Sequence, residues 1–310
     1  MNSQAKIRVA VLGGGISNER EVSLSTASQV MDNLDKEKFQ PVFYDTKTDL
    51  LKLFADAQKN QVDVAFIALH GKGGEDGTIQ GMLELLDVPY IGPGVLASAI
   101  GMDKIVSKQL FEKAGITMPK TFEVHNAQFP CVVKPNVGGS SIGISLVNNT
   151  QEFDQAVSVA FSQDKDILIE EYILGTEITV GVLGNKELQV LPVVEICPKN
   201  KFFDYQAKYD AEYCNEIVPA RISEESARQA QELAKKVYRL LGCKGFSRID
   251  MILRQGTGEP VVLEINTIPG LTPNSLLPKA AEAAGISFSQ LLEKVIMFAL
   301  EKEETKIENA

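Results

Sequence analysis

Four polar side chains near the C-terminus interrupt segments that are otherwise apolar: Arg248, Asp250, Glu264 and Asn266. Because side chains alternate faces along a β-strand, we expect Arg248 and Asp250 on one face of a first strand, and Glu264 and Asn266 on one face of a second. Carboxylate and amide oxygens are the ligands that Mg²⁺ or Mn²⁺ prefers, and an arginine binds phosphate oxygens. The spacing therefore predicts a site for one or two divalent ions beside a phosphate group.

The two strands are predicted over residues 245–253 and 260–266, and the glycine-containing turn between them predicts a hairpin. Their apolar side chains are expected on the opposite face: Ile249, Met251, Leu263 and Ile265. Burying the polar groups without partners would be costly, which favours a functional cluster. The alternative is an ordinary ion pair between Arg248 and Asp250 or Glu264 on a solvent-exposed face.

A second signal is the glycine- and serine-rich segment 137–145 (VGGSSIGIS), which follows Lys134. Gly138 and Gly143 have the spacing of a P-loop, but Ile-Ser replaces the Lys-Ser/Thr pair that a P-loop requires. The segment also fits the G-x-S-x-G pattern of serine hydrolases, yet both histidines precede Ser141, the reverse of the order in that fold. A hairpin tip that covers phosphates, with Lys134 supplying positive charge, is the functional interpretation. A hairpin without a ligand is the alternative.

Two further glycine-rich segments follow predicted strands. Gly13-Gly14-Gly15 fails the dinucleotide fingerprint, because Asn18 stands where the last glycine is required. It predicts a strand-to-helix turn, either as a tight turn alone or with backbone N–H groups that face an anion. Segment 70–77 (HGKGGEDG) follows a buried strand at the edge where open α/β sheets bind ligands, so His70 is a candidate site residue.

The elements that must position these residues fall into two classes. The first ~95 residues alternate between strand and helix patterns, which predicts a parallel sheet covered by helices. Strands are expected at 6–12, 40–45 and 62–69, and helices at 21–34 and 49–59. After a Pro/Gly-rich boundary at 88–94, the expected elements are a helix at 103–114, strands at 131–134 and 167–172, and a helix at 151–161. The strand-rich remainder contains an amphipathic helix at 223–241, with Ser223 as N-cap and Gly242 as the stop.

Composition narrows the class of protein. The chain has 310 residues with a formal net charge of −10, which argues against nucleic acid and membrane surfaces as partners. No apolar run has the length of a spanning helix and no signal-peptide pattern is present, so a cytoplasmic protein is expected. The four cysteines are far apart in the sequence and predict reduced thiols, and the presence of only two histidines favours Mg²⁺ or Mn²⁺ over zinc.

Seven segments resemble the motifs of the D-alanine–D-alanine ligase family, ATP-grasp enzymes of peptidoglycan synthesis. They occur in order at 18–23 (NEREVS), 68–77 (ALHGKGGEDG), 101–104 (GMDK), 134–135 (KP), 138–143 (GGSSIG), 246–250 (FSRID) and 264–272 (EINTIPGLT). The resemblance implies a three-domain ATP-grasp fold of α/β and α+β class, with an N-terminal parallel-sheet domain. The implied domains are an N-terminal α/β substrate domain (1–97), a central ATP-grasp small domain (98–180) and a C-terminal ATP-grasp domain with the metal site (181–310).

The reaction implied by this resemblance has two steps. ATP phosphorylates the carboxylate of one D-alanine, and the amine of a second attacks the acyl phosphate, giving D-alanyl-D-alanine, ADP and phosphate. The implied cofactors are ATP as a substrate and two Mg²⁺ or Mn²⁺ ions, and the implied assembly is a homodimer. The alternative within the fold is a carboxylate–amine ligase with a different amino-acid or hydroxy-acid acceptor. A regulatory module without turnover is disfavoured because Asp250 and Glu264 are both present, and a dehydrogenase has no use for the metal cluster.

Position by position, the resemblance also implies roles around ATP. The residues implied to contact it are Lys104 and Lys134 on the phosphates, Ser140 and Ser141 in the loop above them, Glu170, Tyr172 and Ile173 around adenine, and Glu177 on the ribose. Asp250, Glu264 and Asn266 would hold the metal ions, and Arg248 with the Gly270 backbone N–H would stabilise the charged intermediate.

The remaining implied roles concern the amino-acid substrates. Glu19 would bind the first ammonium with His70 nearby, and Ser140 and Tyr209 would connect to Glu19 through hydrogen bonds. The carboxylate and backbone of the second substrate are assigned to Lys208, Ser275 and Leu276. A tyrosine at position 209 resembles the dipeptide-forming type of the family, which predicts a dipeptide rather than a depsipeptide product.

Overall fold

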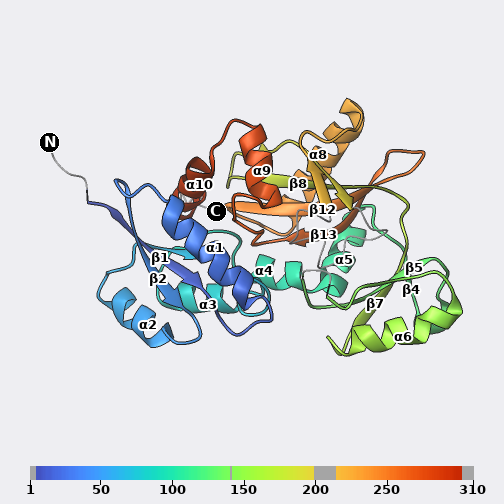
Figure 1. Cartoon of the computed structure of the whole chain (residues 1–310), viewed down its shortest axis with the longest axis horizontal. Helices are drawn as coiled ribbons and strands as arrows, with labels where there is room; N and C mark the ends of the chain where they lie inside the picture. The colour runs from blue at the N-terminus through green and yellow to red at the C-terminus, as the bar shows by residue number, and fades with distance from the viewer. Residues whose placement is uncertain (1–4, 140–141, 199–213, 302–310) are drawn as a thin grey trace, which may run out of the picture.

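A computed structural model describes residues 5–139, 142–198 and 214–301. Three sheets follow one another along the long axis of the molecule, and helices pack on their faces (Figure 1). The chain begins in the three-stranded sheet at one end, reaches the four-stranded sheet at the other end, and returns through the six-stranded sheet between them.

The N-terminal sheet is parallel, as predicted from the alternation of strands and helices. Its order is β2 (Phe39–Asp45), β1 (Ile7–Gly13) and β3 (Val64–Ile67), and the helices of this region are α1 (Arg20–Asn33), α2 (Leu50–Gln58) and α3 (Thr78–Leu85). All four residues of β3 are buried, as expected of a parallel strand covered on both faces. The helix α3 was not predicted.

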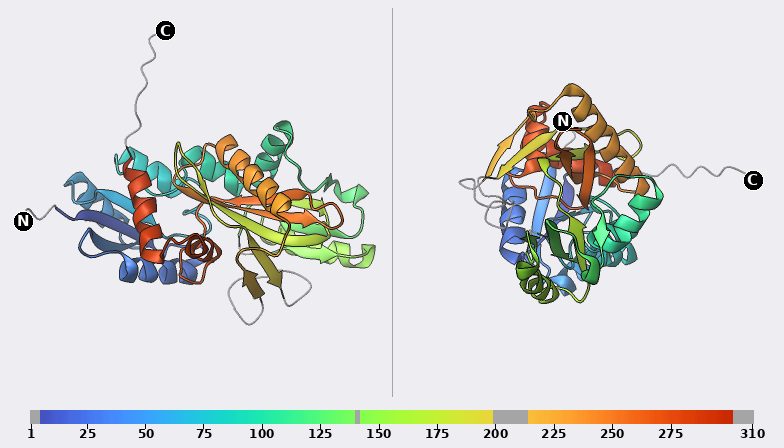
Figure 2. Two further views of the ribbon diagram at one scale, coloured as in Figure 1. Left: turned by 90° about the horizontal axis from the view of Figure 1, so that it is seen from above. Right: turned by 90° about the vertical axis from the view of Figure 1, so that its right-hand side faces the viewer.

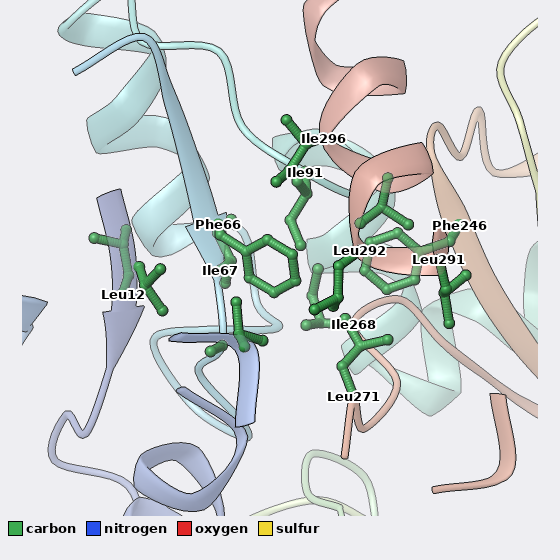
Figure 3. Close-up of a cluster of buried hydrophobic side chains, with 14 of the residues drawn as sticks. Leu12, Phe66, Ile67, Ile91, Phe246, Ile268, Leu271, Leu291, Leu292 and Ile296 are labelled. Carbon is green, nitrogen blue, oxygen red and sulfur yellow. The ribbon is translucent and has the colours of Figure 1, made fainter. Parts of the chain in front are cut away.

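The C-terminal end of the chain completes the core of this first sheet. Figure 3 shows Phe66 of β3 pointing toward Leu292 of α10 (Phe288–Leu300), and both belong to one cluster of buried side chains with Ile67 and Ile296. The strand-rich prediction for the C-terminal region missed α10 and the preceding α9 (Leu276–Ala283). One local signal was present, because Ser287 and Gln290 form a capping box at the start of α10.

Two helices, α4 (Val95–Met102) and α5 (Lys104–Lys113), lead from the N-terminal region to the small sheet. That sheet is antiparallel, in the order β4 (Thr121–Phe122), β7 (Ile167–Glu171), β5 (Cys131–Pro135) and β6 (Ser145–Val147). A short 3-10 helix, η1 (Val124–Asn126), follows β4, and α6 (Thr150–Phe161) buries Phe153, Ala156 and Ala160. The predicted α+β character of this segment is confirmed, although α4 was not predicted.

The large sheet is antiparallel and carries most of the candidate metal ligands. Its strands are β11 (Cys214–Ile217), β10 (Val194–Pro198), β8 (Gly175–Leu183), β12 (Phe246–Arg254) and β13 (Pro260–Asn266), with β9 (Gln189–Val190) beside β8. The β10–β11 hairpin projects away from the rest of the molecule in the left view of Figure 2. The predicted amphipathic helix is α8 (Glu224–Leu240), where the Ser223 side chain accepts from Ser226 N and Gly242 follows the last turn with φ 66°.

No single helix in the described ranges is both long and apolar enough to cross a membrane. The pair α9 and α10 passes that test together by length and composition, but the two helices are bent by 104° at the break between them.

Candidate active site

A pocket lies between the small sheet and the large sheet. The predicted site residues that line it come from both sheets and from α9: Lys134, Glu170, Tyr172, Ile173, Glu177, Arg248, Asp250, Glu264 and Leu276. Between these polar groups the wall is apolar, with Val132 and Ile144 on one side and Ile196, Ile252 and Leu263 on the other. An apolar slot with polar groups at its ends suits a flat ring system that carries charged substituents.

The predicted hairpin forms one end of the pocket. In its register Arg248 lies opposite Asn266 and Asp250 opposite Glu264, so the two polar pairs that alternation predicted on each strand lie side by side. The register shifts between Asp250 and Met251, so Met251 pairs with Val262. The expected position of Leu263 on the opposite, apolar face is therefore wrong, because this β-bulge places Leu263 on the pocket wall next to Glu264.

Arg248 and Asp250 form a buried ion pair. The Arg248 Nε and Nη2 atoms each donate to one oxygen of Asp250 at 2.8 Å, and Thr179 Oγ1 donates to Asp250 Oδ1 at 2.5 Å. The side chains are 12% and 9% exposed, so the pair is not on a solvent-exposed face. Burial opposes the charge on Arg248, but Asp250 beside it outweighs burial and raises the pKa of the guanidinium.

A lysine connects the hairpin to the glycine-rich segment. Lys104 Nζ lies 3.3 Å from Glu264 Oε2 and donates to Gly138 O at 2.8 Å. Lys104 is held at the start of α5, where the Asp103 side chain accepts from Val106 N and the Asn136 side chain accepts from Ile105 N. The predicted phosphate cover and the predicted metal cluster thus share this one cation.

The chemistry of the hairpin residues fits a divalent cation. Asn266 Oδ1 is buried and accepts no hydrogen bond within the described ranges. A buried acceptor without a donor is costly, and a cation bound there would remove that cost. Within the same ranges no group of three or more His, Cys, Asp or Glu side chains is arranged to hold a metal, so a site formed by Asp250 and Glu264 needs the amide of Asn266 as its further oxygen.

Two lysines hold a carboxylate at the other end of the pocket. Glu170, whose side chain is 3% exposed, contacts Lys108 through Oε1 and Lys134 through Oε2, the latter at 2.5 Å. Burial favours the neutral form of Glu170, but the two ammonium groups together lower the pKa of Glu170 below its usual value. Burial also lowers the pKa of Lys108. Glu170 is therefore an ionised acceptor inside an apolar wall.

The N-terminal region places Glu19 beside the same glycine-rich segment. Glu19 is buried, and a Cβ atom added to Gly71 would lie 2.5 Å from Glu19 Oε2, while one added to Gly139 would lie 3.4 Å from it. Both glycines therefore allow close approach of backbone to this carboxylate. His70 lies next to Gly71, with its ring Nε2 3.0 Å from Thr26 Oγ1.

The turn after β1 does not offer an open anion site. Gly15 N donates to Asp45 Oδ1 at 3.1 Å, and Arg20 Nη2 lies 2.5 Å from Asp45 Oδ2. The Arg20 guanidinium keeps the pKa of Asp45 well below its usual range. The anion that this turn faces is thus the carboxylate of Asp45, which agrees with the interpretation of a tight turn alone.

The family described as D-ala D-ala ligase C-terminus matches residues 96–297, and that described as D-ala D-ala ligase N-terminus matches residues 45–93. This chain belongs to the D-alanine–D-alanine ligase family. It is 48% identical to the D-alanine–D-alanine ligase of Syntrophobacter fumaroxidans, over 96% of this chain and 99% of that protein.

Two solved structures of the family have the same fold. The D-alanine–D-alanine ligase of Bacillus anthracis complexed with ATP has a TM-score of 0.80 at 35% identity, over 95% of this chain and 97% of that chain. The VanG D-Ala:D-Ser ligase of Enterococcus faecalis has a TM-score of 0.81 at 37% identity, over 95% of this chain and 100% of that chain. The ATP-grasp fold predicted from the motifs is thereby confirmed.

The family motif that ends at residue 272 continues into a compact turn before α9. Thr272 Oγ1 and Thr272 N both lie within hydrogen-bond distance of Ser275 Oγ, at 2.8 and 3.2 Å. A Cβ atom on Gly270 would lie 3.0 Å from the same hydroxyl, so Gly270 and Ser275 are direct neighbours. Four predicted site residues of this ligase lie outside the described residues: Ser140, Ser141, Lys208 and Tyr209.

Lys108 and Thr179, which contact Glu170 and Asp250, were missed by the sequence analysis. Lys108 is four residues after Lys104, hence on the same face of α5, and that spacing was a usable signal. Thr179 lies two residues after Glu177 on β8 and opposite Asp250. The period of a strand places Thr179 and Glu177 on one face, but the pairing of β8 with β12 is a tertiary contact that no local pattern specifies.

Proposed function

We propose that this protein joins two D-alanine molecules into D-alanyl-D-alanine for peptidoglycan precursors, with ATP converted to ADP and phosphate. The γ-phosphoryl group of ATP passes to a carboxylate oxygen of the first D-alanine, and its bond to ADP breaks. The amine of the second D-alanine then attacks the carbonyl carbon. A C–N bond forms, the C–O bond to phosphate breaks, and the amine loses a proton. Membership of the ligase family and the ATP complex of a relative support the use of ATP.

One observation carries the proposal: the glycine-rich segment touches both halves of the site. Its Gly138 carbonyl accepts from Lys104, which also pairs with Glu264, and its Gly139 lies against Glu19. A phosphoryl group held under this segment lies between the metal cluster and the substrate carboxylate. Phosphoryl transfer requires mainly such positioning and neutralisation of charge.

The nucleotide roles follow from the two ends of the pocket. Glu170 accepts from the adenine amino group, with Tyr172 and Ile173 beside the ring, and Glu177 binds the ribose. Lys104 at the hairpin end neutralises the phosphates, together with Lys134, which contacts Glu170 at the adenine end in this structure. Ser140 and Ser141 donate hydroxyl groups from the loop above them.

Asp250, Glu264 and Asn266 are proposed to hold two Mg²⁺ or Mn²⁺ ions. The buried acceptor of Asn266 supports this assignment. Bound there, the ions neutralise charge on the phosphates. Arg248 and the backbone N–H of Gly270 are assigned to the oxyanion that forms at the reacting carboxyl group.

The residues proposed to bind the two D-alanine molecules lie in several parts of the chain. Glu19 binds the ammonium of the first D-alanine with His70 nearby, and Ser140 and Tyr209 connect to Glu19. The second D-alanine is bound by the remaining substrate-site residues: Lys208, Ser275 and Leu276. The burial of Glu19 supports an electrostatic role, since a buried carboxylate is a strong acceptor for an ammonium group.

The test is ADP release from ATP and Mg²⁺ with D-alanine, L-alanine, D-alanine plus D-serine, or D-alanine plus D-lactate, with the product mass recorded. We expect release with D-alanine alone and the mass of the dipeptide. The D-serine reaction is included because one relative is a D-Ala:D-Ser ligase. If a mixed product forms in preference to the D-alanine dipeptide, the proposed second substrate is wrong, but the proposed use of ATP stands. No ADP release with any mixture would contradict the proposed reaction.

We also propose a cytoplasmic homodimer with domains at 1–97, 98–180 and 181–310. The three sheets support a division into three parts, although β8 (Gly175–Leu183) of the large sheet crosses the proposed boundary at 180/181. Residues beyond 181 fill the core of the first domain, so we expect the first domain to unfold if α10 is deleted. Light scattering in solution checks the assembly, and a mass of one chain would exclude the dimer.

A further inference from the structure

We propose that Lys108 is a positioning residue for adenine recognition: it holds the Glu170 carboxylate in place when Lys134 binds phosphate. The inference rests on the proposed function, in which Glu170 accepts from the adenine amino group. It adds a third lysine to the nucleotide site, beside Lys104 and Lys134.

The contacts divide the Glu170 carboxylate between two cations. Lys134 Nζ lies 2.5 Å from Oε2, and Lys108 Nζ contacts Oε1. Lys108 Nζ also donates to Pro119 O at 2.9 Å, a backbone carbonyl that keeps this ammonium group at the rim of the adenine pocket. Lys108 is thus fixed by two acceptors that do not belong to the substrate.

Lys134 has two competing tasks. Its ammonium group is assigned to the ATP phosphates, and a lysine that moves to a phosphate no longer neutralises Glu170. A carboxylate as buried as Glu170 is costly to leave without a cation, because desolvation then favours its protonated form. Lys108 supplies the remaining cation, so Glu170 stays an acceptor after Lys134 has turned toward phosphate.

A single helix sets the distance between the two ends of the site. Lys104 and Lys108 lie one helical turn apart on α5, a rise of about 6 Å along the axis. Lys104 contacts Glu264 at the hairpin, and Lys108 contacts Glu170 at the adenine end. The helix therefore connects base recognition to the phosphate end of the nucleotide.

The experiment compares ATP with inosine triphosphate, which carries a carbonyl oxygen in place of the adenine amino group. An ionised Glu170 accepts from the amino group and repels the carbonyl, whereas a protonated Glu170 donates to the carbonyl. Lys108→Met should therefore lower the ratio of kcat/KM for ATP over inosine triphosphate by at least about 10-fold, mostly through KM for ATP. A loss of stability alone would not change this ratio.

The control variant is Lys113→Met, which removes an exposed lysine from the same helix and should leave the ratio unchanged. Lys108→Arg restores a buried cation and should recover most of the selectivity. If Lys108→Met does not fold, Lys108→Gln provides a neutral side chain that still donates to Pro119 O, and the same loss of selectivity is expected. An unchanged ratio in a folded neutral variant overturns the proposal.

The two hypotheses fail in distinguishable ways. A wild-type enzyme that does not prefer ATP over inosine triphosphate would contradict the role of Glu170 itself, and with it the adenine site. A wild-type enzyme that prefers ATP, with the same preference in Lys108→Met, would contradict only the positioning role of Lys108. Equal loss in Lys108→Met and a folded Lys108→Arg would show that charge at this position is not the cause.

Discussion

The two ends of the pocket differ in how their buried oxygen acceptors are satisfied among the described residues. At the adenine end, Glu170 has one lysine on each oxygen and is 3% exposed. At the hairpin end, Glu264 is 32% exposed with Lys104 at 3.3 Å, and the neighbouring Asn266 Oδ1 accepts no hydrogen bond among the described residues. At the adenine end the protein itself supplies the cations that pair with Glu170. At the hairpin end Asn266 Oδ1 is an acceptor to which a cation can bind.

This difference indicates two ways of preparing a site. A saturated carboxylate is oriented before the ligand arrives, so the protein already bears the cost of ordering it. An acceptor that lacks a donor is unfavourable in the free protein and becomes favourable when a cation binds. We therefore expect substitutions at the hairpin end to change turnover and its dependence on Mg²⁺ concentration more than they change the stability of the fold. The buried ion pair between Arg248 and Asp250 is the exception.

The largest expected effect is that of Glu264→Ala. Removing this carboxylate takes away a proposed metal ligand and an ion-pair partner of Lys104, so kcat should fall by at least about 100-fold, the usual cost of losing one charge-stabilising group. The fold should persist, because Glu264 is partly exposed. ADP release in the presence of D-alanine measures the first effect and thermal unfolding the second.

Glu259→Ala is the matched control. Glu259 lies just before the same strand, is exposed, and accepts from Thr117 Oγ1 at 3.1 Å, away from the pocket. The Glu259→Ala variant should have the activity of the wild type. Near-normal turnover in a folded Glu264→Ala variant would remove this residue from the proposed metal site.

Substitutions in the buried ion pair between Arg248 and Asp250 should affect stability as well as turnover. Arg248→Met leaves Asp250 buried without its cation, so the free energy of unfolding should fall by about 3 kcal/mol. The double variant Arg248→Met/Asp250→Asn removes the unpaired charge and should recover much of the stability but none of the turnover. Urea unfolding separates the variants, and a double variant as unstable as the single one would show that packing, not charge, causes the loss.

Asn266→Leu tests the unpartnered acceptor. A side chain of similar shape without Oδ1 removes a buried group that accepts no hydrogen bond in the described part of the chain, so stability should not decrease. The Mg²⁺ concentration for half-maximal turnover should rise by about 10-fold. A matched response to Mg²⁺ in the variant and the wild type would argue that Asn266 is not a ligand.

Local patterns were sufficient for much of the fold. The predicted helix at 223–241 was recovered as α8, because its amphipathic pattern, its N-cap Ser223 and the Gly242 that follows it are all local signals. The helix α10 was missed because apolar residues outside its buried face, such as the exposed Met297, blur the contrast between an apolar and a polar face. Only its capping residues indicated its start.

The site was predictable where one strand or one hairpin determines it. Alternation placed Arg248 and Asp250 together on one strand and Glu264 and Asn266 together on the next, while the register that sets Asp250 opposite Glu264 came from the structure. The bulge that moved Leu263 onto the pocket wall arises where β12 pairs with β8 as well as β13, and a single strand does not reveal such packing. The pairing of Lys108 with Glu170 joins residues 62 positions apart, so it required the tertiary structure.

The smallest expected effect concerns a charge pair that points away from the pocket. Ile196 of β10 lines the pocket, and the preceding Glu195 faces the other way and pairs with Arg221 at 2.7 Å. Hydrogen bonds from Arg221 lower the pKa of Glu195 to about 2. Glu195→Gln should leave kcat/KM unchanged and lower stability at neutral pH by about 1 kcal/mol, because Arg221 is 65% exposed and its pair is screened by water.

The pH dependence of this loss follows from the sign of the pKa shift. The unfolded carboxyl group has a pKa of about 4.3, so the folded state gains from the ionised Glu195 at pH values above that. As the pH falls toward 2, both states become protonated and the gain disappears. The stability difference between wild type and Glu195→Gln, measured by urea unfolding, should therefore be constant above about pH 5 and shrink below it. A difference that does not shrink between pH 5 and pH 2 would show that the charge of Glu195 is not its cause, and a change in turnover at pH 7 would show that this pair contributes to the pocket.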